Sequence, residues 1–171
     1  MSDNIDTMSK VSITTGIFVD SILDQLEFNT KANRVFIFTV NLVSDISKST
    51  YWEYLSVKEK IQANNYYTKS LSDKYVMSHG ILRYILGYYT KQSPQEIKYA
   101  TNKYGKPFLQ DSNIKFNMSH SKSIVSYIIA YDNNVGIDIE FNDNNLDVME
   151  LSKLVLTTKE SVLLESLEYN K

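Results

Sequence analysis

Cysteine is absent from this chain of 171 residues, which excludes disulfides and thiolate metal sites. No apolar run is long enough for a membrane-spanning helix. The formal net charge is only −2, so the composition favours neither nucleic acid nor a membrane surface as a partner. The first residues include Asp3 and Asp6 and lack the apolar stretch of a secretory signal, so a cytoplasmic location is expected.

Glycine and proline are also scarce, with 5 and 2 residues, which indicates short loops. A hydrophobic content of 43% is ordinary for a folded core, and the length predicts one domain with or without a tail. We expect residues 34–171 to form that domain. Residues 1–33 are expected to be an N-terminal extension, either a loosely ordered leader or an appended amphipathic helix over residues 16–28.

Strand and helix patterns both occur within the main domain. Residues 34–43 are rich in β-branched and aromatic side chains and predict a strand. Residues 70–89 carry an apolar stripe with helical spacing and predict a long helix. Glutamate three residues after serine or threonine predicts helix starts at Ser56, Ser93 and Thr157. The expected fold class is therefore α+β, an antiparallel sheet with packed helices.

Three more strands are predicted, over residues 114–119, 124–131 and 135–140. The Asp-Asn-Asn sequence at residues 132–134 suits the second turn, because these residues tolerate left-handed backbone. The three strands would form a meander that brings the Ser119-His120 end into one sheet with the last strand.

That last strand carries a pair of carboxylates. Asp138 and Glu140 alternate with isoleucines, so in a strand both carboxylates leave the same face. Two adjacent like charges repel unless a cation lies between them, and Mg²⁺ prefers oxygen ligands of this kind. A lone Asp-x-Glu pattern is common, so a solvated strand face is the alternative interpretation.

Two upstream segments carry groups that suit phosphate. Ser119 and His120 place a hydroxyl beside an imidazole, a combination that binds phosphate oxygens. Gly105 permits a turn with positive φ and Pro107 fixes the chain after it, which holds Lys106 on a rigid turn. Taken alone, the Gly-Lys-Pro sequence is equally explained as an ordinary turn.

The order of these segments is more specific than any one of them. Gly-Lys-Pro at 105–107, Phe-Asn-x-Ser-His-Ser at 116–121 and Val-Gly-Ile-Asp-Ile-Glu at 135–140 follow one another along the chain. This ordered set resembles the 4′-phosphopantetheinyl transferases of the Sfp type. The resemblance covers about residues 34–168. It implies a transferase-like fold that is C-terminally incomplete, with one lobe plus part of the second. The family pattern continues with a Trp-x-x-Lys-Glu helix that carries a third metal carboxylate, and that helix is not found in this sequence.

The resemblance implies Mg²⁺-dependent transfer of the 4′-phosphopantetheine group from coenzyme A to a serine of an acyl or peptidyl carrier protein. It implies that Asp138 and Glu140 hold the metal and that His120 is a catalytic residue that binds phosphate. The base that removes the proton of the carrier serine stays open: the resemblance points to the absent third carboxylate or to a metal-bound water, with Glu140 as the fallback. It also implies contacts with coenzyme A from a larger set, namely Gly105, Lys106, Pro107, Ser119, His120, Lys74 and Lys60.

Other polar residues on the helices have ordinary structural interpretations. Lys60 lies on a helix where the family contacts a nucleotide phosphate, but Glu59 stands where another lysine is expected. Arg83 lies within the apolar stripe and either pairs with a buried carboxylate or reaches a phosphate. His79, a single histidine on that helix, is expected to be structural.

Two rival interpretations stay open. The chain is a non-catalytic relative that binds coenzyme A or a carrier protein, or it is half of a split enzyme. In the second case another subunit, or self-association, would supply the missing carboxylate.

Overall fold

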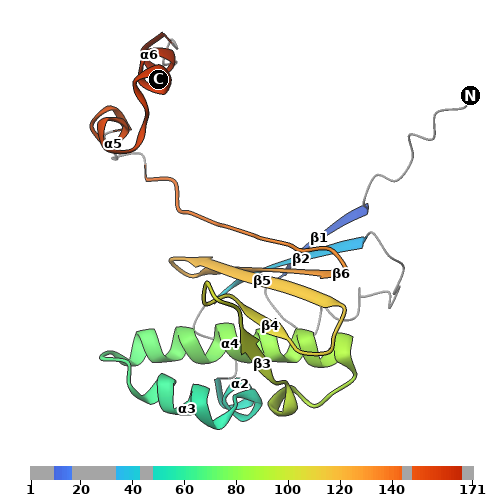
Figure 1. Cartoon of the computed structure of the whole chain (residues 1–171). Coiled ribbons are helices and arrows are strands. Elements are labelled where there is room, and N and C mark those ends of the chain that lie inside the picture. Colours follow the sequence, from blue (N-terminus) through green and yellow to red (C-terminus); the bar gives the residue numbers. More distant parts are fainter. Residues whose placement is uncertain (1–9, 17–33, 43–47, 144–147, 167–171) are drawn as a thin grey trace, which may run out of the picture. The chain divides into compact units, whose positions relative to one another are not determined.

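A four-stranded sheet covered by helices on one face forms the body of the protein (Figure 1). The computed structural model describes residues 10–16, 34–42, 48–143 and 148–166. The sheet has the strand order β1-β2-β6-β5, with bounds Lys10–Gly16, Arg34–Asn41, Ile124–Tyr131 and Ile114–Ser121. The pairs β2–β6 and β6–β5 are antiparallel, whereas β1 runs parallel to β2. The predicted α+β class is confirmed, with a parallel edge strand that the sequence patterns did not predict.

The remaining elements are short, apart from one helix. Before the last two strands of the sheet come α2, α3, α4, the 3₁₀ turn η1 and a small hairpin of β3 and β4, with bounds Lys48–Tyr54, Val57–Asn64, Lys69–Thr90, Pro94–Glu96, Tyr99–Thr101 and Pro107–Leu109. The long predicted helix is confirmed as α4. Of the helix considered for residues 16–28, Gly16 belongs to β1 and the rest lies outside the described residues.

The core forms between α4 and one face of the sheet. Alternate residues of β2, such as Phe36 and Phe38, are buried as the period of a strand requires. They pack in one cluster with Ile81 and Ile85 of α4. Tyr127 of β6 lies in the same core, and its hydroxyl donates to the Ser78 carbonyl at 2.9 Å. This bond satisfies a buried polar group and ties the sheet to α4.

Helix α2 crosses α4 at a glycine. A Cβ atom added at Gly80 would lie 2.6 Å from the Cβ of Tyr51, so only glycine permits this approach. Tyr51 is buried there. This crossing fixes the start of the helical layer against the middle of α4.

Helix starts are explained by capping at two of the three predicted positions. Ser56 accepts from the Glu59 backbone N–H, and the Ser56 backbone donates to the Glu59 carboxylate, which confirms a capping box. Thr157 and Glu160 make the same reciprocal bonds. At Ser93 a short helix does begin, the 3₁₀ helix η1 with Pro94 at its first position, but the predicted capping box was wrong, because Ser93 makes no side-chain cap bond.

The segment Val135–Glu140 is not a strand, which corrects the predicted meander. Strand β6 pairs with β2 on one edge and with β5 on the other, so no edge of β6 is left for a third hairpin partner. The turn before the segment was predicted correctly, since Asp132 has φ 63°. The segment instead follows β5 through side-chain hydrogen bonds, as described below.

The chain divides into two compact units, residues 1–140 and 141–171. The second unit contains α5 (Val148–Val155) and α6 (Thr158–Ser166). The boundary at residue 34 stays a prediction. Among the helices that the structure describes, none combines the length and the apolar character needed to cross a bilayer.

Candidate functional site

The two predicted metal carboxylates lie on the same side of an extended segment. Asp138 and Glu140 are exposed, and Ile137 and Ile139, which alternate with them, are partly buried. The Ser119 hydroxyl donates to Asp138 Oδ1 at 2.8 Å. Two residues further along β5, the Ser121 hydroxyl donates to Glu140 Oε2 at 3.3 Å. The carboxylates therefore form a pair with fixed partners.

Strand β5 positions this segment through its polar face. Residues 117, 119 and 121 alternate along β5 and share one face of the strand. The Ile137 N–H donates to Asn117 Oδ1 at 3.0 Å, and the Ile139 N–H donates to Ser119 Oγ at 3.3 Å. The segment of residues 135–140 thus runs in the same direction as β5. Its backbone N–H groups bond to side chains of β5, where a paired strand would bond to backbone carbonyls. Asn117 and Ser121 belong to the motif at residues 116–121, but their role in positioning the carboxylate segment was not predicted.

The carboxylate pair fits a hard divalent cation by its chemistry. Mg²⁺ is commonly bound by one or two carboxylates, with water and substrate phosphate oxygens completing its shell. Asp138 and Glu140 supply such oxygens, and both are accessible to solvent. Within the described residues, no group of three or more metal-ligating side chains is found. The site can therefore offer two protein ligands and leaves the other positions to solvent and substrate.

Lys106 is held against the same segment. Gly105 has φ 81°, as predicted for this turn, and Asn102 closes the turn by accepting bonds from the Tyr104 and Lys106 backbone N–H groups. The Lys106 ammonium donates to the Val135 carbonyl. This bond ties the hairpin of β3 and β4 to the start of the carboxylate segment, and it places a positive charge beside it.

His120 points to the opposite face of β5 from Ser119, because neighbouring residues of a strand alternate. It lines a cavity of about 180 Å³ together with Lys74 and His79 of α4. The predicted site residues therefore fall into two groups. Ser119, Asp138 and Glu140 form one with Lys106, and His120 forms the other with Lys74.

Lys60, the remaining predicted ligand, has partners on its own helical layer. Its ammonium lies 3.7 Å from Glu53 Oε2 and 5.7 Å from the centre of the Trp52 ring. An ion pair with an exposed carboxylate is weak, so these contacts do not prevent Lys60 from meeting a phosphate. They do explain why this lysine is half-buried on α3.

Glu59 stands at the position where a lysine was expected, because it completes a buried network. Its Oε2 accepts from Arg83 Nε at 2.5 Å, and Arg83 also donates to the carbonyls of Pro94 and Ile97. Burial raises the pKa of Glu59, but hydrogen bonds from His79 and Ser56 and the charge of Arg83 together lower it to about 2. Of the two interpretations of Arg83, the structural one is confirmed.

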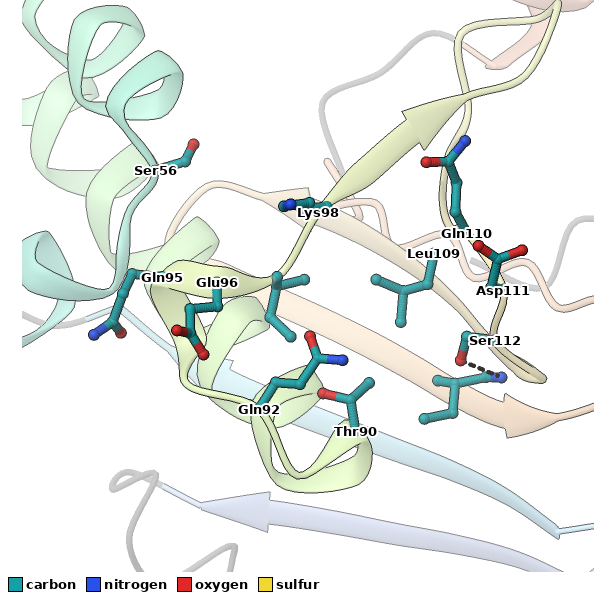
Figure 2. A pocket seen from close by; sticks show the side chains of 12 residues that line it. Ser56, Thr90, Gln92, Gln95, Glu96, Lys98, Leu109, Gln110, Asp111 and Ser112 are labelled. Atoms are coloured by element: carbon teal, nitrogen blue, oxygen red, sulfur yellow. Dashed lines mark hydrogen bonds between the residues drawn. The ribbon is translucent and has the colours of Figure 1, made fainter.

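A larger cavity lies apart from the predicted site residues. Its volume is about 770 Å³, and it opens between the end of α4, η1 and the turn after β4 (Figure 2). Thr90, Gln92, Gln110 and Ser112 are among the side chains on its walls. The described residues that line it include none of the predicted site residues. Volume alone therefore does not assign the function of this chain.

A comparison with known proteins finds a relative in the same family that the ordered motifs resemble. The chain is 34% identical over 117 residues to HetI, a 4′-phosphopantetheinyl transferase of Nostoc sp. strain PCC 7120. The match covers 66% of this chain and 49% of that protein, so the chain spans about half the length of the curated relative it matches. No family model matches the chain.

Proposed function

We propose, from the ordered motifs and the similarity to a 4′-phosphopantetheinyl transferase, that the chain is a member of that superfamily and transfers the 4′-phosphopantetheine group of coenzyme A to a serine of an acyl or peptidyl carrier protein. The observation that carries the proposal is the pair of bonds from Ser119 and Ser121 that holds Asp138 and Glu140 side by side. A carboxylate pair of this kind, beside hydroxyl and lysine groups, suits a magnesium-bound pyrophosphate.

The reaction needs charge neutralisation and positioning more than covalent participation of the protein. Asp138 and Glu140 would hold Mg²⁺, which when bound neutralises charge on the pyrophosphate oxygens. Lys106 adds a positive charge at the segment that carries these carboxylates. On the α4 face of β5, His120 and Lys74 bind a further phosphate group of coenzyme A, which orients the cofactor across the edge of the sheet.

The transfer balances as a substitution at phosphorus. The carrier serine oxygen forms a bond to the β-phosphorus of coenzyme A, and the bond from that phosphorus to the bridging oxygen breaks. The bridging oxygen leaves with its electron pair on 3′,5′-ADP. Glu140, which is exposed and fixed by Ser121, accepts the proton of the attacking serine.

The experiment incubates the purified chain with an apo carrier protein, coenzyme A and Mg²⁺, and follows the mass of the carrier. A gain of one phosphopantetheine group on the carrier serine is expected, and it should be lost with a serine-to-alanine carrier or with chelator. Calorimetry of coenzyme A binding runs in parallel. Binding without any mass gain would favour a module that holds the cofactor without turnover, and absence of both would refute the proposal.

A further inference from the structure

The small cavity between β5 and α4 gathers basic side chains. Its volume of about 180 Å³ is below the roughly 300–1,000 Å³ of pockets that enclose a whole small molecule, so it suits one chemical group. The described residues that line it include no carboxylate and four basic side chains, Lys74, His79, His120 and Lys122. Basic side chains without a competing carboxylate suit an anionic group such as a phosphate.

His79 is fixed in this cavity from two sides. Its ring stacks on Tyr75 with ring centres 4.0 Å apart and planes 27° apart. Its Nδ1 lies 3.7 Å from Glu59 Oε1, and Glu59 is itself held by Ser56 and Arg83. With Nδ1 turned toward Glu59, Nε2 is the ring nitrogen left for a ligand. The buried network thus determines how the imidazole is presented.

A comparison with Arg83 on the same helix argues against a purely structural role. The Arg83 side chain is 2% exposed and donates to one carboxylate and two carbonyls, so the fold accounts for it. The His79 side chain is 27% exposed and lines a cavity shared with Lys74 and His120. A histidine needed only for packing would not have to reach that cavity.

We propose that His79 is a further anion-binding residue of the coenzyme A site, and that Glu59 is the positioning residue that orients its ring. The identity of the ligand depends on the proposed function, because coenzyme A brings the phosphate groups. The cavity and the orientation of the ring do not depend on it. Glu59 and His79 would thus have different roles: the carboxylate bonds one ring nitrogen and thereby fixes which nitrogen of the imidazole faces the ligand.

The test measures binding of coenzyme A, and separately of inorganic pyrophosphate, to the full chain by calorimetry. We expect His79→Ala to raise the Kd of both ligands about tenfold or more, the effect of losing one hydrogen bond to a charged group. Glu59→Gln should raise both Kd values by a similar factor. The double variant should bind no more weakly than either single variant, because both act through one imidazole.

Thr39→Val is the control for lost stability, because it removes the hydrogen bond between Thr39 and Ser126, 2.9 Å long, and neither residue lines the cavity or contacts Glu59. It should lower the Tm and leave both Kd values unchanged. An unchanged Kd in His79→Ala, or a Kd raised equally by Thr39→Val, would overturn the inference. If Glu59→Gln does not fold, the Kd values of His79→Ala and His79→Gln still decide whether His79 binds the anion.

The two ligands separate this inference from the proposed function. If the wild-type chain binds pyrophosphate but not coenzyme A, the proposed function fails and the pyrophosphate arm alone decides the role of His79. If it binds neither ligand, both proposals fail. If coenzyme A binding is normal and insensitive to His79→Ala, only the inference about His79 fails.

Discussion

Asp138 tests the metal hypothesis at the scale of a single residue. Its Oδ1 accepts from Ser119 and from the Ile139 N–H, so the side chain is oriented before any ligand arrives. Asp138→Asn keeps the shape and removes the charge. We expect coenzyme A to bind the wild type more tightly with Mg²⁺ than without it, and the variant to bind with the same affinity in both conditions. Calorimetry with and without Mg²⁺ measures this difference.

Asp111→Asn supplies the control for that experiment. Asp111 is exposed, has φ 52° and lies at the other cavity, and asparagine tolerates this left-handed backbone. The control should keep the full response to Mg²⁺. A response to Mg²⁺ that survives in Asp138→Asn would remove Asp138 from the metal site.

His120 tests the second group of site residues. His120→Ala deletes an imidazole that lines the cavity beside Lys74. Coenzyme A binding should weaken by about 1.5–3 kcal/mol, the range for hydrogen bonds to charged groups. Because His120 and Asp138 lie on opposite faces of β5, the variant should keep its response to Mg²⁺. An affinity within error of the wild type would exclude His120 from the site.

At the scale of elements, the Glu59–Arg83 pair joins α3 to α4 and, through the carbonyls of Pro94 and Ile97, to η1 and the residue that follows it. Glu59→Gln would leave Arg83 charged and buried without its partner. Breaking such a pair costs about 3–5 kcal/mol of unfolding free energy. Urea unfolding at neutral pH should show this loss, whereas Ser56→Ala should lose only about 1 kcal/mol with its cap.

The same pair predicts how the stability difference depends on pH. The pKa of Glu59 is lowered from 4.5 to about 2 in the folded chain, so the folded state favours the carboxylate. Its contribution is complete above the unfolded pKa and is lost as the pH falls from about 4.5 toward 2. The gap in unfolding free energy between wild type and Glu59→Gln should therefore be constant above pH 5 and shrink in acid. A gap that is unchanged at pH 2.5 would contradict this account.

Local patterns predicted local structure, and pairing over distance was where they failed. The caps at Ser56 and Thr157 and the positive φ of Gly105 depend on a few neighbouring residues, and all were predicted. Ser93 has the same capping pattern but begins only a 3₁₀ turn. The segment 135–140 alternates like a strand, yet periodicity does not reveal that β2 already occupies the edge of β6.

The candidate site was predictable to a similar extent. The motif order drew attention to Asp138, Glu140 and Ser119, which the structure brings together. It did not reveal that His120 would face the other side of β5 beside His79. Nor could it explain Glu59, whose buried partner lies 24 residues away along the chain. Contacts of that kind require the packing of α3 on α4.

At the scale of the whole molecule, the division into two units predicts where ligand binding should slow hydrogen exchange. Each residue assigned here to coenzyme A or to Mg²⁺ lies in the unit of residues 1–140. A ligand that binds only the folded state stabilises it by about 2.7 kcal/mol at a concentration of 100 times its Kd. Hydrogen exchange with coenzyme A and Mg²⁺ should therefore slow in α4, in β5 and in the segment 135–140, while α5 and α6 exchange as in the free chain. In Asp138→Asn, Mg²⁺ should add no further slowing. Equal slowing in α5 and α6 would show that the binding site is not confined to the first unit, which would contradict the assignment.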